Sequence, residues 1–168
     1  MSLILMIELR DITWDNLWDV IELAPKVEQA HYIPTTAVYM AQAWVNLKAG
    51  DEGACLAVYN NNMLVGFAKI ELVPAGLYPF DFDEDAYYLD GFLIGAKFQG
   101  KGLGRLALGA IVAFMRNKPF GNADAIKLSC YDENAGAVRL YEAFGFIGLD
   151  KFIPDKSGRK DLRVYELR

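Results

Sequence analysis

Histidine is almost missing from this sequence of 168 residues, since His31 is the only one. A single histidine excludes a metal site built from several histidines and argues against a histidine-based catalytic triad. Cysteine is also scarce: Cys55 and Cys130 both lie in strand-like segments without a metal-type neighbour. We therefore expect two core thiols, with neither a disulfide nor a nucleophile, and we expect no metal site.

Long apolar runs are missing too. No stretch approaches the ~20 residues that cross a bilayer, and no signal peptide is visible, so we expect a cytoplasmic protein without a membrane partner. Lys and Arg total 17 against 22 Asp and Glu, which gives a net charge of −5. This balance argues against nucleic acid and favours a small cationic partner. No repeat or linker interrupts the sequence, which predicts a single domain over residues 1–168.

Apolar periodicity and turn residues predict an alternation of strands and helices. Strands are expected over 3–9, 55–59, 63–71, 87–94, 125–131, 146–153 and 162–167, and helices over 14–23, 36–48, 103–116 and 134–144. Turns are expected at 60–62 and 155–158. The helix at 36–48 is expected to pack through a partly apolar face that consists of Val38, Ala41, Trp44, Val45 and Leu47.

A glycine-rich loop separates the central strand from the helix that follows it. Gly100, Gly102 and Gly104 remove side chains there, so that several backbone N–H groups can converge on one anion at the positive end of the helix. Gly102 stands where a P-loop needs Ser or Thr, and Arg105 stands where a dinucleotide fingerprint needs glycine. The pattern Gln-x-x-Gly-x-Gly, which begins at Gln99, predicts a phosphate cradle; the alternative is a glycine turn without a ligand.

At this point the sequence resembles the GNAT acyltransferases, whose Gln/Arg-x-x-Gly-x-Gly/Ala loop binds the pyrophosphate of acetyl-CoA. A second segment, from Asn134 to Phe146, is similar to the Asn-x-x-Ala-x-x-Leu/Phe-Tyr-x-x-x-Gly-Phe helix of that family. Two motifs in the right order, separated by a helix and a strand, are more specific than either alone. The resemblance implies the GNAT fold, an α/β (α+β) architecture with one mixed sheet of about seven strands, splayed at a bulge and flanked by about four helices.

The resemblance also implies acetyl-CoA as cosubstrate and assigns residues to it. Contacts to acetyl-CoA are expected from Phe92, Leu93, Ile94, Gln99, Gly100, Lys101, Gly102, Leu103, Gly104, Arg105 and Asn134. N–H groups at a strand bulge, expected at Leu93 and Ile94, would stabilise the charge that develops on the thioester carbonyl. Tyr141 would protonate the departing thiolate.

An amine acceptor needs a base, because an alkylamine has a pKa near ~10.4 and must lose a proton before it attacks. Asp90, in the strand before the glycine loop, is the preferred base, and Glu71, at the end of the preceding strand, is the alternative. Asp90 could instead face solvent or bind a nearby backbone group. The candidate substrate-binding residues are therefore Glu71, Tyr88 and Asp90.

Segments 29–33 (Gln-Ala-His-Tyr-Ile), 40–43 (Met-Ala-Gln-Ala) and 65–68 (Val-Gly-Phe-Ala), together with the residues from Tyr88 to Gly104, resemble those of bacterial spermine/spermidine (diamine) acetyltransferases. This implies transfer to a primary amine, such as the polyamines spermidine and spermine, by direct attack in a ternary complex. An acidic loop either lines the approach to the thioester or is merely solvated, and its residues are Asp81, Asp83, Glu84 and Asp85.

The sequence departs from the family pattern at 72–86, which is longer, and at Gly91 and Gly95. These departures leave other acceptors open, among them a peptide N-terminus or another small amine. A catalytically weak acyl-CoA-binding domain is the alternative to an enzyme, and a noncatalytic nucleotide-binding module is a third interpretation. A homodimer is compatible with the sequence and is not required by it.

Overall fold

The computed structural model describes residues 6–155 and 160–168. In this part of the chain, seven strands form one sheet in the order β1-β2-β3-β4-β5-β7-β6. Their bounds are β1 (Ile7–Asp11), β2 (Gly53–Asn60), β3 (Met63–Val73), β4 (Ala86–Ile94), β5 (Ala125–Cys130), β6 (Ile147–Ile153) and β7 (Leu162–Leu167). Neighbouring strands are antiparallel except β4 and β5, which run parallel. Residues 3–5 of the first expected strand and residues 156–158 of the last expected turn lie outside the described residues.

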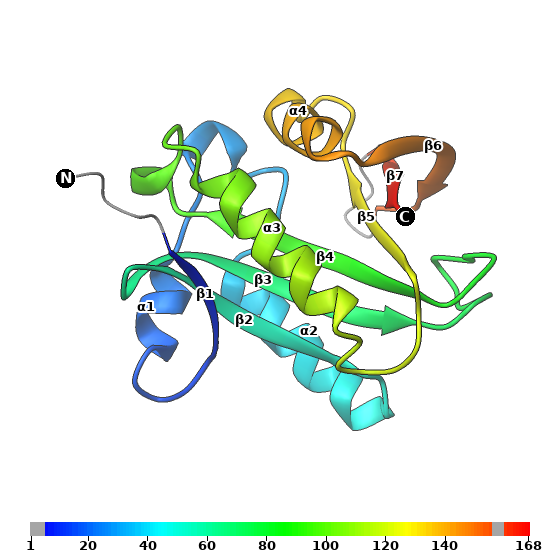
Figure 1. Cartoon of the computed structure of the whole chain (residues 1–168), viewed down its shortest axis with the longest axis horizontal. Coiled ribbons are helices and arrows are strands. Elements are labelled where there is room, and N and C mark those ends of the chain that lie inside the picture. Colours follow the sequence, from blue (N-terminus) through cyan, green and yellow to red (C-terminus); the bar gives the residue numbers. More distant parts are fainter. Residues whose placement is uncertain (1–5, 156–159) are drawn as a thin grey trace.

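Helices cover both faces of this sheet (Figure 1). They are α1 (Leu17–Glu22), α2 (Thr36–Ala49), α3 (Leu103–Arg116) and α4 (Ala135–Phe144), with short 3-10 helices η1 (Val27–Gln29) and η2 (Ala96–Phe98). The mixed sheet with four α-helices confirms the predicted architecture. Among the described residues, no helix is both long and apolar enough to cross a membrane.

The two faces of the sheet have separate cores. On one, the α2 face, Val20 of α1 and Tyr39 of α2 pack with Phe67 of β3. On the other, the α3 face, Leu108 of α3 packs with Ile70 of β3, and the same core contains further residues of β4, β5 and α4. Cys55 and Cys130 are free thiols, as expected.

Local signals explain several boundaries. The Thr35 hydroxyl accepts from the Val38 N–H at 3.4 Å at the start of α2, and Gly50 ends that helix with a φ of 92°. Asn61 and Asn62 take φ values of 48° and 66° in the turn between β2 and β3, a conformation that asparagine tolerates.

The predicted start of the first helix at Trp14 is wrong. Residues 13–16 form a turn, in which the Asn16 side chain accepts from the Thr13 N–H at 2.8 Å, and α1 begins only at Leu17. Thr13 therefore supports the turn and does not cap the helix.

The apolar face predicted for α2 is also wrong. This helix packs on the sheet through Tyr39, with Thr36 buried at its start, while the expected residues are exposed: Val38, Ala41, Trp44, Val45 and Leu47. Apolar residues occur on several sides of α2, so the sequence does not distinguish the packed side. Part of the exposed face lines the cleft described below.

The sheet opens between β4 and β5. Their ladder pairs Ala86–Leu89 with Ala125–Leu128 and goes no further, and the two strands then diverge (Figure 1). On its other side, β4 stays paired with β3 as far as Ile94, which pairs with Gly66. The second half of β4 therefore borders a gap in the sheet.

A bulge lies at Asp90, where this gap begins. Leu89 pairs with Ile70 and Gly91 pairs with Lys69, so Asp90 is the extra residue on β4. The bulge expected at Leu93 and Ile94 is therefore misplaced, because those two residues remain in register with β3. The extra residue also reverses the alternation of side chains between the two faces. Tyr88 before the bulge and Gly91 and Leu93 after it all lie on the α2 face, so that this face has even-numbered positions before Asp90 and odd-numbered positions after it.

Candidate active site

A cleft of about 1000 Å³ occupies the opening between β4 and β5. It reaches both faces of the sheet, because its lining includes residues of α2 and residues of α4. The predicted site residues in the lining are Glu71, Tyr88, Asp90, Phe92, Leu93, Ile94, Gln99, Gly100, Gly104, Asn134 and Tyr141. Four others do not line it: Lys101, Gly102, Leu103 and Arg105.

The side chains of three of these residues, Lys101, Leu103 and Arg105, are held away from the cleft. Lys101 Nζ donates to the Lys97 carbonyl at 3.0 Å, and Arg105 Nη1 donates to the Ala143 carbonyl at the end of α4, also at 3.0 Å. Leu103 is buried in the core. Gly102 and Leu103 can therefore contact a ligand only through their backbone atoms.

The glycine loop presents backbone donors to open space. N–H groups in the first turn of α3 have no carbonyl within the helix to bind, and the first helical bond runs from the Leu106 N–H to the Gly102 carbonyl at 3.4 Å. Gly100 and Gly102 have φ values of 74° and 77°, and a Cβ added at either would meet no atom within 4 Å. The loop thus fits an anion such as a diphosphate.

Gln99 ties this loop to two other segments. Its Nε2 donates to the Ile94 carbonyl at 2.9 Å and to Gln29 Oε1 at 2.8 Å. Gln29 belongs to η1, whose position next to the loop was not foreseen from the sequence. The Gln99 side chain therefore fixes the loop against the end of β4 and supplies no donor of its own to an anion in this structure.

Two amides of β4 face the gap. The Gly95 N–H donates to the Val65 carbonyl on β3 at 2.9 Å, and alternate residues of a strand point to opposite sides. The backbone N–H of Leu93 therefore also points toward β3, whereas those of Phe92 and Ile94 point toward the side from which β5 has departed. These two N–H groups lie beyond the last β4–β5 ladder pair.

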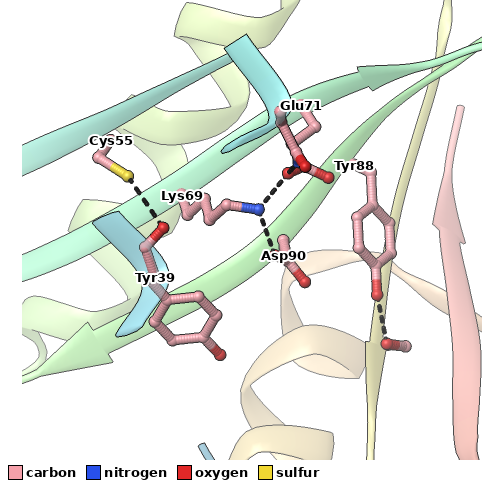
Figure 2. Close-up of polar contacts among 8 residues, drawn as sticks. Tyr39, Cys55, Lys69, Glu71, Tyr88 and Asp90 are labelled. Atoms are coloured by element: carbon pink, nitrogen blue, oxygen red, sulfur yellow. Dashed lines mark hydrogen bonds and ion pairs between the residues drawn. The ribbon is translucent and has the colours of Figure 1, made fainter. Parts of the chain in front are cut away.

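On the α2 face, three charged side chains form one ion group (Figure 2). The Lys69 ammonium, whose side chain is only 2% exposed, binds Glu71 and lies 2.5 Å from Asp90 Oδ2. Asn46 Nδ2 donates to Glu71 Oε1 at 2.5 Å. We call Lys69, Glu71 and Asp90 the ion group. Lys69 was missed in the sequence analysis, although a lysine inside the apolar run of β3 is a visible signal.

Neighbouring charges and burial together shift the pKa values of Lys69 and Glu71. Burial opposes the charge of Lys69, but Asp90 and Glu71 outweigh this effect and raise its pKa, so the ammonium persists at neutral pH. Burial and the neighbouring Asp90 raise the pKa of Glu71, against the lowering effect of Lys69 and Asn46. With all three groups ionised, two carboxylates face one ammonium and the net charge is negative.

Tyr141 lines the cleft from α4. Its ring centroid lies 6.0 Å from that of Phe146 and 6.4 Å from that of Tyr165. Burial raises the pKa of Tyr141, so its hydroxyl keeps its proton at neutral pH. In α4, the side chain of Asn134 also accepts from the Ala137 N–H at 3.3 Å and caps the helix.

Tyr88 lies where β4 and β5 are still paired. Its hydroxyl is 2.5 Å from Ser129 Oγ on β5, so the two side chains bridge the strands next to the point of divergence. Burial raises the pKa of Tyr88, and the nearby Asp90 charge adds to this effect. Its hydroxyl therefore remains neutral beside the ion group.

The acidic loop does not line the cleft, which contradicts the binding role considered for it. Asp85 accepts from the Ala75 N–H at 2.9 Å, and Glu84 pairs with Arg168 at 2.8 Å. These contacts close the loop on itself and hold the end of the chain. Among the described residues, the acidic side chains that do line the cleft are Asp51, Glu71, Asp90 and Asp155.

Position 91 requires glycine because Tyr39 of α2 packs closely against β4 there. A Cβ at this position would lie 2.8 Å from Cζ of Tyr39, whose ring is buried. Gly91→Ala is therefore expected to destabilise the fold by about 1–3 kcal/mol, measured by urea unfolding. Gly136→Ala is the matched control, because a Cβ there meets no atom within 4 Å. Equal stability of the two variants would contradict this account of Gly91.

Comparison with known proteins gives one consistent result. The model of the acetyltransferase (GNAT) family matches residues 14–146. The chain is 33% identical over 144 residues to a spermine/spermidine N(1)-acetyltransferase of Bacillus subtilis (strain 168), and the match covers 83% of this chain and 87% of that protein.

Solved structures share the fold. An aminoglycoside acetyltransferase in complex with coenzyme A superimposes with a TM-score of 0.72 at 21% identity, over 96% of this chain and 93% of that one. A putative acetyltransferase from Salmonella typhimurium, with its cofactor acetyl-CoA, superimposes with a TM-score of 0.65 at 20% identity, again over 96% and 93% of the chains.

Proposed function

Because this chain belongs to the acetyltransferase (GNAT) family, we propose that it transfers an acetyl group from acetyl-CoA to a polyamine such as spermidine or spermine. One observation carries this proposal: a single cleft is lined by the glycine loop, by β4 where its amides face the gap and by the ion group. The Bacillus subtilis relative, whose name specifies spermine and spermidine, supports the choice of acceptor. We further propose that residues 1–168 act as one domain.

Acetyl-CoA would supply the activated acetyl group and a thiol leaving group. Its diphosphate fits the N–H groups at the start of α3, next to Gly100 and Gly102, where the structure leaves open space. The backbone N–H groups of Phe92 and Ile94 would bind the acyl end and the adjoining arm, since they border the gap. Asn134, which lines the cleft while it caps α4, would contact the same arm.

The acceptor would approach from the α2 face. Asp90 is the preferred base because it lies at the edge of the gap and its side chain is 26% exposed, against 12% for Glu71. It would take the proton from the amine directly or through a water molecule. Glu71 and Tyr88 would complete the walls around the amine.

On the opposite face, Tyr141 would act on the leaving group. Its raised pKa means that the hydroxyl stays protonated, whereas a thiol has an ordinary pKa near ~8.5. Tyr141 would therefore stabilise the departing thiolate chiefly by donating a hydrogen bond to it. The base and this donor approach the reacting centre from the two sides of the sheet.

A polycation matches the charges and the apolar surface of the cleft. Among the described residues that line it, four are acidic and Lys69 is the one Lys or Arg. Methylene segments of a polyamine would lie against the part of the exposed apolar side of α2 that lines the cleft, namely Val38, Ala41 and Val45. The negative charge of the cleft would attract the ammonium groups of the polyamine, and the apolar side of α2 would contact the methylene segments between them.

The decisive experiment follows free thiol release by the purified protein with acetyl-CoA and a panel of amines. Spermine and spermidine are expected to be turned over with a higher kcat/KM than a monoamine, a peptide with a free N-terminus or an aminoglycoside. A higher kcat/KM with one of these other amines would identify that amine, and not a polyamine, as the acceptor. If the protein binds CoA but releases no thiol from acetyl-CoA with any amine, it is an acyl-CoA-binding domain without this activity.

Charge in the cleft gives a second test. Asp51 lines the cleft, whereas Asp83 in the acidic loop does not. Asp51→Asn is expected to raise the KM for spermine about two- to fivefold, with a smaller effect for a monoamine and a smaller difference at high salt. Asp83→Asn should leave both KM values unchanged. If the two variants behave alike, the cleft carboxylates do not attract the acceptor.

A further inference from the structure

Lys69 is a buried cation in the lining of a cleft that we propose to bind a cationic amine, which is unusual. Its ammonium is buried between Glu71 and Asp90, where it contacts both carboxylates (Figure 2). An acceptor ammonium would be attracted to the same carboxylates, and Lys69 already satisfies part of their charge. Lys69 pairs across the sheet with Gly91, next to the bulge, so its reach to Asp90 also fixes the side chain of the extra residue.

We propose that Lys69 is a positioning residue that sets the net charge facing the acceptor, so that the reacting amine meets one net negative charge instead of two. This inference rests on the proposed function. Two uncompensated carboxylates would bind the ammonium form tightly and would hold it protonated, and an ammonium cannot attack a thioester. A single net negative charge still attracts the cation but allows its proton to leave.

Other titratable groups near the ion group stay neutral over the working range. They come from every element packed around it: Tyr39 from α2, Cys55 from β2, Tyr88 from β4 and Tyr141 from α4. Burial is the largest cause of the raised pKa of each, and that of Cys55 reaches about 12. Two further carboxylates line the same cleft: Asp51, in the turn before β2, and Asp155, just after β6.

The test compares three variants that change this charge by known steps. Lys69→Met leaves a net charge of two negatives, Glu71→Gln leaves none, and the double variant Lys69→Met/Glu71→Gln returns to one. We measure kcat against pH with spermidine at saturating acetyl-CoA. The midpoint of the rising limb should move up by about 1–3 pH units in Lys69→Met and down in Glu71→Gln, because a nearby charge shifts a titration by that amount.

The double variant distinguishes charge from packing. Its midpoint should return to within about half a pH unit of the wild-type value, although two native side chains are lost. If Lys69 acted only through packing, the double variant would recover nothing. Should Lys69→Met fail to fold, the comparison of Glu71→Gln with the double variant still carries the test, since the double variant must have the higher midpoint.

Lys127 provides a matched control. It is also a buried lysine on a strand, paired with Glu166, and it does not line the cleft. Lys127→Met should lower stability without moving the midpoint. Equal midpoints in all variants would overturn the role of Lys69 while amine acetylation by the wild type remains. Absence of acetylation by the wild type with every amine would instead refute the proposed function.

Discussion

Tyr141→Phe is expected to lower kcat by roughly 10- to 1000-fold while the protein stays folded. The substitution keeps the ring, which packs against Phe146 and Tyr165, and removes only the hydroxyl. Among the described residues, no side chain or backbone group is hydrogen-bonded to this hydroxyl, and the residue lines the cleft, so the loss should fall on the leaving group rather than on stability. Thiol release under saturating substrates measures the effect.

Tyr165→Phe is the matched control for this prediction. Tyr165 is a neighbouring buried tyrosine, and it does not line the cleft. Its kcat should equal that of the wild type, and both variants should unfold at similar urea concentrations. A Tyr141→Phe variant that turns over normally would reduce Tyr141 to a packing residue and leave water as the donor to the sulfur.

Gly104→Val is expected to raise the KM for acetyl-CoA roughly 10- to 100-fold, which corresponds to about 1.4–2.8 kcal/mol of lost binding. Gly104 lies in the first turn of α3, and it lines the cleft. A Cβ at this position would lie 3.5 Å from Leu140 and 4.0 Å from Ile94, which both line the cleft, so the valine methyl groups would fill cleft space beside the loop. The diphosphate could then no longer approach the backbone.

Gly109→Val on the same helix separates this effect from loss of helix stability. A Cβ at Gly109 would lie 3.8 Å from Phe144, and this residue does not line the cleft. Its KM for acetyl-CoA should stay within about twofold of the wild-type value. Equilibrium binding of CoA supplies an independent measurement, and unchanged affinity in Gly104→Val would remove the glycine loop from the cofactor site.

Features that depend on local sequence could be predicted well. The helix α3 begins at Leu103 and the helix α2 at Thr36, both as expected, because glycine, threonine and apolar spacing act within a few residues. The same holds for the hairpin turn at Asn61 and Asn62. The glycine loop and the segment from Asn134 onward indicated the fold through their resemblance to the GNAT family, a resemblance that is specific because each motif combines several residue types at fixed spacing.

Features that depend on pairing between distant segments could not be predicted. The bulge at Asp90 exists because Lys69 pairs with Gly91 while Ile70 pairs with Leu89, and no signal within β4 specifies that register. The ion group depends on the same register, so Lys69 was overlooked. The position of the acidic loop could not be predicted for a related reason. Glu84 and Asp85 bind partners that are distant in the sequence, Arg168 and the Ala75 N–H, and local sequence does not reveal them.

Because the alternation of side chains along β4 reverses at Asp90, even-numbered positions before and after the bulge lie on different faces and can change separately during evolution. Substitutions at positions 88 and 90 alter the α2 face, where the acceptor would bind, whereas positions 92 and 94 belong to the α3 face. If the proposed function holds, acceptor preference could change by point mutation at the first pair of positions while the residues that contact acetyl-CoA are retained. One extra residue in a single strand thus gives each face of the sheet its own set of positions.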